Sequence, residues 1–133
     1  MDLRRIIIGC LVVLCSIFYS AIPTYAQIPP SSGEISQYRG LPSAAARGDV
    51  AEIKALTAKG EKPDIRDSYG RTPLHVAAYR GHHEAMRALV NAGANPNTLE
   101  NDRYDIVTIA SVANDIPTLK VAISLGGSTK NIT

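Results

Sequence analysis

The residues of this 133-residue chain best suited to chemistry are its three histidines, His75, His82 and His83. Imidazole is the commonest metal ligand in proteins and a frequent general base. His82 and His83 are adjacent, so on a helix their side chains point about 100° apart and cannot jointly hold one metal ion in the usual way. We therefore expect structural histidines and no metal site.

Other catalytic groups find equally little support in the sequence. No serine or cysteine stands in a recognisable pattern with a base and an orienting acid, and no glycine-rich phosphate loop is present. The aspartates lie where helix caps and turns need a carboxylate: Asp49, Asp64, Asp67, Asp102 and Asp115. The formal net charge of +2 is too small to indicate nucleic acid or an anionic membrane as a partner. The sequence predicts a protein without cofactor that is not an enzyme.

The elements that position these residues repeat along the chain with a period of 33 residues. The clearest markers are glycines: Gly48 and Gly81, and then Gly60, Gly93 and Gly126. A period in this range is typical of a stacked repeat array. Each unit has the pattern of two short helices, and the glycines end them because glycine readily adopts a left-handed conformation.

The second unit contains the most specific motif. Residues 72–77 read Thr-Pro-Leu-His-Val-Ala, and Gly81 and His82 follow. This segment resembles the TPLHxA motif of ankyrin repeats. The resemblance implies an all-α ankyrin-repeat solenoid of paired antiparallel helices joined by hairpin-like loops, with repeats at about 41–69, 70–102 and 103–133. It also implies that His75 and His82 have scaffold roles.

The third unit departs from the motif. Asp105 stands where the family has threonine, and Asn114 stands where it has glycine. Both changes are compatible with helices, because aspartate is a good N-cap and asparagine tolerates the left-handed conformation. The terminal unit has no further repeat to cover Ile106, Ile109, Val121 and Ile123. A partner, self-association, a fold-back of the N-terminal part, or low stability are the alternatives.

Residues 1–26 have the pattern of an export signal. Arg4 and Arg5 precede a nearly uncharged apolar run at residues 6–22, and small residues lead to a predicted cleavage after Ala26. An uncleaved membrane anchor is the main alternative, because 17 apolar residues are at the lower limit for a spanning helix. A lipoprotein box at Cys10 and twin-arginine export fit less well.

Both cysteines, Cys10 and Cys15, lie in this segment, so the mature chain would contain no disulfide. Residues 27–40 hold two prolines and several serines and glycines without apolar periodicity. This composition predicts a flexible linker before the repeat domain at residues 41–133.

The resemblance also implies where a partner binds, since related proteins use a concave face made of the loop tips and the first helix of each unit. Tyrosine and arginine often dominate binding energy at such surfaces. The predicted partner-binding residues are Arg47, Ser68, Tyr69, Arg71, Tyr79, Arg80, Asp102 and Tyr104.

We therefore expect an exported, bacterial-type ankyrin-repeat protein that acts in the periplasm or after secretion as a non-catalytic protein-binding module. The partner is another protein, with no nucleic acid and no membrane after signal cleavage. An accessory or protective subunit of a periplasmic enzyme, for example in oxidative-stress defence, and a secreted effector that binds host proteins are the alternative functions.

Overall fold

The computed structural model describes residues 27–131. The predicted export signal, its cleavage position and both cysteines lie outside the described residues. Within residues 27–131 there is no β-strand, and no helix there is long and apolar enough to cross a membrane.

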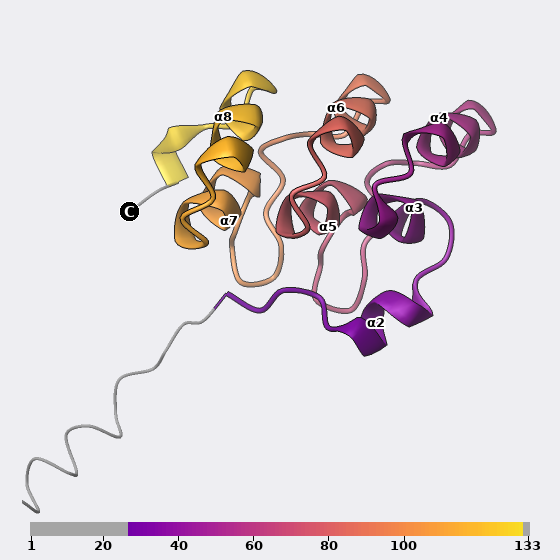
Figure 1. Ribbon diagram of the computed structural model, residues 1–133, viewed down its shortest axis with the longest axis horizontal. Helices are drawn as coiled ribbons and strands as arrows, with labels where there is room; N and C mark the ends of the chain where they lie inside the picture. The colour runs from indigo at the N-terminus through magenta and orange to yellow at the C-terminus, as the bar shows by residue number, and fades with distance from the viewer. Residues whose placement is uncertain (1–26, 132–133) are drawn as a thin grey trace, which may run out of the picture.

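The fold is a stack of three antiparallel helix pairs (Figure 1). The pairs are α3 (Leu41–Arg47) with α4 (Val50–Ala58), α5 (Pro73–Tyr79) with α6 (His83–Asn91), and α7 (Ile106–Val112) with α8 (Ile116–Ser124). The first helices, α3, α5 and α7, form one row, and the second helices form the other. Long loops join each pair to the next, and their tips extend beyond the first row. The predicted all-α repeat architecture is confirmed.

The helix boundaries follow from the residues predicted to set them. The side chains of Asp49, Asp105 and Asp115 each accept a hydrogen bond from a backbone N–H in the first turn of the helix that follows. Asn114 adopts a φ of 53°, the left-handed conformation that Gly81 provides one repeat earlier at 68°. The substitutions of the third unit therefore preserve the geometry of the second.

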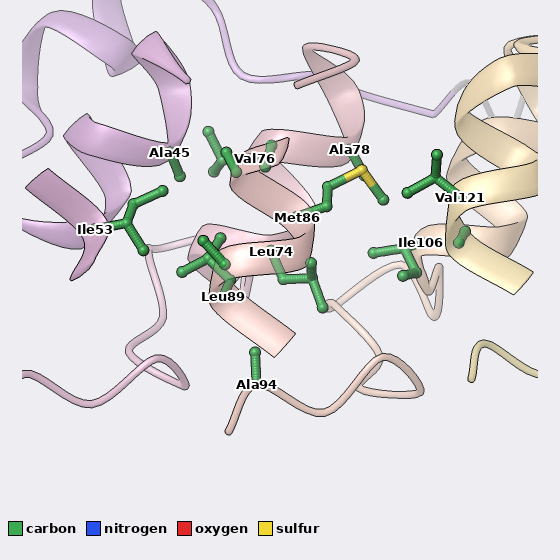
Figure 2. Packing of buried hydrophobic residues seen from close by; sticks show 14 of the residues in the cluster. Ala45, Ile53, Leu74, Val76, Ala78, Met86, Leu89, Ala94, Ile106 and Val121 are labelled. Atoms are coloured by element: carbon green, nitrogen blue, oxygen red, sulfur yellow. The ribbon is translucent and has the colours of Figure 1, made fainter. Parts of the chain in front are cut away.

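The core is continuous through the stack (Figure 2). Small residues of the first helices, such as Ala45 and Ala78, let neighbouring helices approach closely, while Ile53, Met86 and Leu89 of the second helices fill the space between them. Leu89 and Met86 are fully buried. Each repeat thus buries its apolar residues against its neighbours, as expected of a solenoid.

The segment predicted to be a flexible linker is folded, which corrects that prediction. Ser32–Gln37 form helix α2, which lies beside the first row near the loop tips (Figure 1). A capping box begins it: the Ser31 hydroxyl accepts from the Glu34 N–H, and the Glu34 carboxylate accepts from the Ser31 N–H at 2.9 Å. Composition alone suggested flexibility because the contacts that hold this helix come from residues far along the chain.

The last repeat is closed by the end of the described chain. The 3₁₀ helix η1 (Thr129–Asn131) folds back on α7, and the Asn131 amide donates to the Asp105 carboxylate at 2.7 Å. Ile106, Ile109 and Val121 are buried, contrary to the expectation that they lack cover. Of the four residues named there, only Ile123 is exposed, at 45%.

Candidate protein-binding surface

Two neighbouring loop tips form the most exposed part of the concave face. Each tip is closed by a backbone bond, from the Asp67 N–H to the Arg71 carbonyl and from the Glu100 N–H to the Tyr104 carbonyl, both at 3.0 Å. The tips are also bonded to each other, because the Asn101 N–H donates to the Tyr69 carbonyl at 3.1 Å. These bonds fix the relative positions of the two tips.

The side chains at the tips point into solvent. Tyr69 is 41% exposed, and its ring covers the Arg71 guanidinium at 4.5 Å from ring centroid to Cζ. Such stacking on a cation holds an exposed aromatic ring in place. Ser68 and Asp102 are exposed beside it. We call Ser68, Tyr69 and Asp102 the tip surface.

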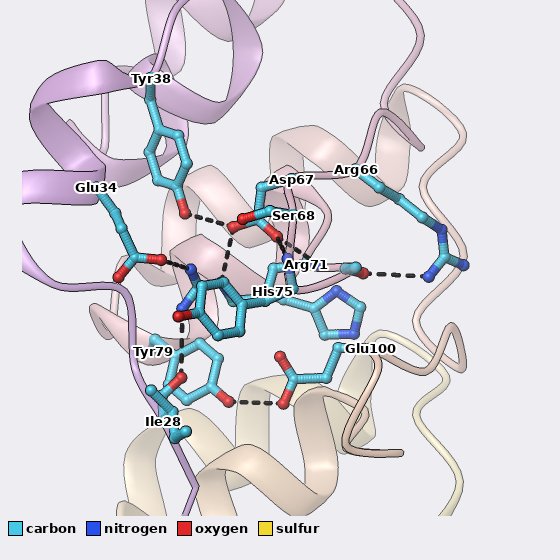
Figure 3. A network of polar contacts seen from close by, with 12 residues as sticks. Ile28, Glu34, Tyr38, Arg66, Asp67, Ser68, Arg71, His75, Tyr79 and Glu100 are labelled. Atoms are coloured by element: carbon cyan, nitrogen blue, oxygen red, sulfur yellow. Dashed lines mark hydrogen bonds and ion pairs between the residues drawn. The ribbon is translucent and has the colours of Figure 1, made fainter.

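Arg71, predicted to contact a partner, is buried instead, with only 1% of the residue exposed. Its guanidinium pairs with the Asp67 carboxylate at 2.8 Å and with the Glu34 carboxylate of α2 (Figure 3). It also donates to the Ile28 carbonyl at 3.3 Å. The correction has one physical cause: the N-terminal segment lies on this part of the concave face and uses all sides of the guanidinium.

A tyrosine completes this cluster. The Tyr38 hydroxyl donates to the Asp67 carboxylate at 2.7 Å. Burial would raise the pKa of Asp67, but the bonds from Tyr38 and Arg71 outweigh it and hold that pKa below its ordinary value. The bonds within the capping box lower the pKa of Glu34 in the same direction. We call Glu34, Tyr38, Asp67 and Arg71 the Arg71 cluster.

Tyr79 is also engaged within the chain. It is half-buried, and its hydroxyl donates to the Glu100 carboxylate at 2.9 Å (Figure 3). Burial raises the pKa of the Tyr79 hydroxyl, and burial likewise raises the pKa of Glu100 despite the bond from Tyr79. Tyr79 therefore joins the helix α5 to the next loop and offers little free surface.

The remaining predicted residues divide by exposure. Arg47 is exposed but pairs with Asp49 and Glu52 on α4. Arg80 is exposed, and its Nε donates to the Ala46 carbonyl at 3.3 Å. Tyr104 is half-buried against the core. The structure thus brings Ser68, Tyr69 and Asp102 together, with Arg80 and Arg47 at the ends of the first helices.

Histidines hold the repeats together. The His75 Nε2 donates to the Thr98 carbonyl at 2.8 Å, and its Nδ1 accepts from the Thr72 N–H at 3.0 Å. Burial lowers the pKa of His75, so the neutral ring forms both bonds. His82 and His83 each bond to a neighbouring repeat, at Ala46 and Thr118. No group of three or more His, Cys, Asp or Glu suited to a metal ion occurs in residues 27–131.

Sequence reasoning missed Glu34 and Glu100, which are central to this face. Glu34, Asp67 and Glu100 are spaced 33 residues apart, and Tyr38, Arg71 and Tyr104 share the same spacing. The repeat period extended toward the N-terminus would therefore have shown that residues 34–38 occupy the place of a loop tip. Their composition hid this equivalence.

The stacked helix pairs and bonded loop tips define a helical repeat protein of the solenoid class. A family model described as "Ankyrin repeats (3 copies)" matches residues 41–133. The chain belongs to the ankyrin-repeat family. Ankyrin repeats are protein-interaction modules and are typically not enzymes.

Curated relatives match the repeats only. The chain is 42% identical over 59 residues to oxysterol-binding protein-related protein 1 of Rattus norvegicus, which covers 43% of this chain and 6% of that protein. It is 41% identical over 61 residues to ankyrin repeat domain-containing protein 39 of Homo sapiens, covering 46% and 33%. It is 49% identical over 55 residues to human ankyrin repeat domain-containing protein 29, covering 41% and 18%. The chain therefore spans a third or less of each of these relatives.

Proposed function

We propose that this chain is a non-catalytic module that binds another protein through the tip surface and acts outside the cytoplasm. The observation that carries the proposal is the placement of Tyr69, which is 41% exposed yet held by its stack on Arg71 and by the bond between the tips. A rigid exposed tyrosine offers a large contact area with little loss of side-chain entropy on binding.

Charged groups flank this tyrosine. Asp102 lies on the neighbouring tip, and Arg80 is exposed at the end of helix α5. Such groups favour a partner with complementary charges and fix its orientation. Arg71 and Tyr79, which were part of the predicted surface, support it from beneath.

Action outside the cytoplasm rests on residues 1–26 of the sequence, with their two arginines, apolar run and small residues before Gln27. The accessory subunit of a periplasmic enzyme and the secreted effector differ in where the partner is found. Recovery of the partner from the periplasmic fraction favours the first, and recovery from a host cell favours the second.

The test is a crosslinking pull-down from the extracytoplasmic fraction of the source organism, with the chain from Gln27 to Thr133 as bait. The matched variants are Tyr69→Ala and Ile123→Ala, which truncate side chains of similar exposure, 41% and 45%, on different faces. We expect Tyr69→Ala to lose the partner and Ile123→Ala to retain it. Loss with Ile123→Ala alone would overturn the proposal and assign binding, or self-association, to the terminal repeat.

A further inference from the structure

The N-terminal segment is bound to the concave face much as a separate peptide would be. The Ile28 carbonyl and the Glu34 carboxylate both accept from the Arg71 guanidinium, and Pro30 between them is buried. The Tyr38 hydroxyl then reaches Asp67 at 2.7 Å. We call residues 27–38 the docked segment. Its backbone, a proline and a carboxylate are what the face recognises.

The docked segment is held less firmly than the repeats. Helix α2 has six residues, none of them buried, whereas α5 has six buried residues of seven. A helix of this length is not stable without its contacts. Segments with few buried apolar contacts open at lower free energy than the core that supports them. Residues 27–38 can therefore leave the face while the repeats stay folded.

Release of the segment exposes a specific site. The Arg71 side chain, fully buried while the segment is docked, would lose Glu34 and the Ile28 carbonyl but keep Asp67. Its freed N–H groups form a fork that matches a carboxylate. Tyr69 borders this site, so a partner bound at the tip surface reaches it directly.

We propose that the docked segment is an intramolecular ligand of the concave face, displaced by a partner segment of the same chemistry, extended and carrying a proline followed by a carboxylate that pairs with Arg71. This inference rests on the proposed function for the choice of face and adds the chemistry of the ligand. Binding is then coupled to release of residues 27–38.

The experiment uses a labelled synthetic peptide of residues 27–39 as the probe and fluorescence polarisation as the readout. The host is the chain from Gln27 to Thr133, which holds every residue that the structure describes, as wild type and as Glu34→Gln. Hydrogen bonds to charged groups are worth a factor of about ten or more in an equilibrium constant. We therefore expect Glu34→Gln to bind the peptide at least about tenfold more tightly than wild type, because its own segment competes less well.

Three controls make the result specific. Glu84→Gln removes an exposed carboxylate of α6 that pairs only with Arg87 among the described contacts, and it should bind the peptide like wild type. A peptide with Glu34→Gln should lose the gain. Adding Arg71→Lys to the Glu34→Gln host should also lose it, with circular dichroism confirming that the helices remain.

Equal peptide affinity in wild type and Glu34→Gln would overturn the inference, as would a gain that survives loss of the peptide carboxylate. Dimerisation of Glu34→Gln in light scattering would also overturn it, because the face would then exchange segments between copies. The peptide assay involves no natural partner. It can therefore fail while the pull-down with Tyr69→Ala succeeds, and the reverse.

Discussion

At the scale of single residues, surroundings rather than residue type decide the role of each charged group. Arg71 and Arg80 are both arginines on the predicted concave face, but the first is buried among Glu34, Asp67 and Ile28 while the second is exposed. Glu34 and Glu100 occupy equivalent positions of the repeat, yet their pKa values are displaced in opposite directions. The bonds of the capping box dominate at Glu34, and burial dominates at Glu100.

Glu100 gives a prediction about pH. Its pKa is raised in the folded state, so the stability it contributes is present at low pH and is lost as pH rises above about 4.5 and through the folded value. We expect Glu100→Gln to be at least as stable as wild type at pH 7, since glutamine still accepts from Tyr79 and carries no charge. Urea unfolding at pH 4 and pH 7 measures this. A variant that loses more stability at pH 7 than at pH 4 would contradict it.

Buried leucines give a prediction about packing. Leu89 is 0% exposed and lies between neighbouring repeats, so Leu89→Ala should lower the free energy of unfolding by about 2 to 5 kcal/mol. Ile123→Ala, on the exposed side of α8, should change it by less than about 1 kcal/mol. Chemical denaturation followed by circular dichroism compares the two, and equal effects would show that Leu89 is not a core residue.

At the scale of elements, local signals in the sequence predicted the helices well. Asp49, Asp105 and Asp115 cap helices as expected, and Asn114 takes the left-handed conformation. These signals act within a few residues, so they can be recognised along the chain. Helix α2 and the burial of Arg71 were missed because they depend on contacts between residues 37 or more positions apart, such as Glu34 with Arg71 and Ile28 with Arg71.

The second loop tip contains a strained position that the sequence did not reveal. Arg103 has a φ of 66°, where Gly70 has 72° one repeat earlier. A left-handed conformation costs a residue with a side chain about 1 to 2 kcal/mol, and glycine returns part of this as entropy of the unfolded chain. We expect Arg103→Gly to stabilise the protein by about 0.5 to 1 kcal/mol.

Arg103→Ala is the matched control, because it removes the arginine side chain but keeps the Cβ. Thermal unfolding of the two variants separates the backbone effect from the loss of the charge. Equal melting temperatures of Arg103→Gly and Arg103→Ala would show that this tip stores no strain.

At the scale of the whole molecule, both ends of the described chain fold back on the stack. The docked segment covers part of the concave face at the first two repeats, and η1 closes the last repeat through Asn131 and Asp105. A stack of three repeats has little core to share, so such end contacts help it to stay folded. The docked segment adds a second consequence, because it lies beside the surface proposed to bind a partner.

Acid should loosen this segment. The pKa values of Glu34 and Asp67 are lowered in the folded state, so their contribution is complete above about pH 4.5 and is lost as pH falls through the folded values. We expect the difference in unfolding free energy between wild type and Glu34→Gln to be largest near neutral pH and to vanish in acid. A difference independent of pH would mean that the Glu34 charge does not hold the segment.

The central claim is that residues 27–38 are docked on the concave face yet separable from the repeats. Amide hydrogen exchange at neutral pH tests it most directly, at the bonded N–H groups of Ile35 and Tyr38 and at those of Met86 and Ile109 in the repeats. The account predicts measurable protection of the first pair, at a lower opening free energy than the second. Exchange of Ile35 and Tyr38 at the rate of an unfolded chain, or only together with Met86 and Ile109, would contradict it.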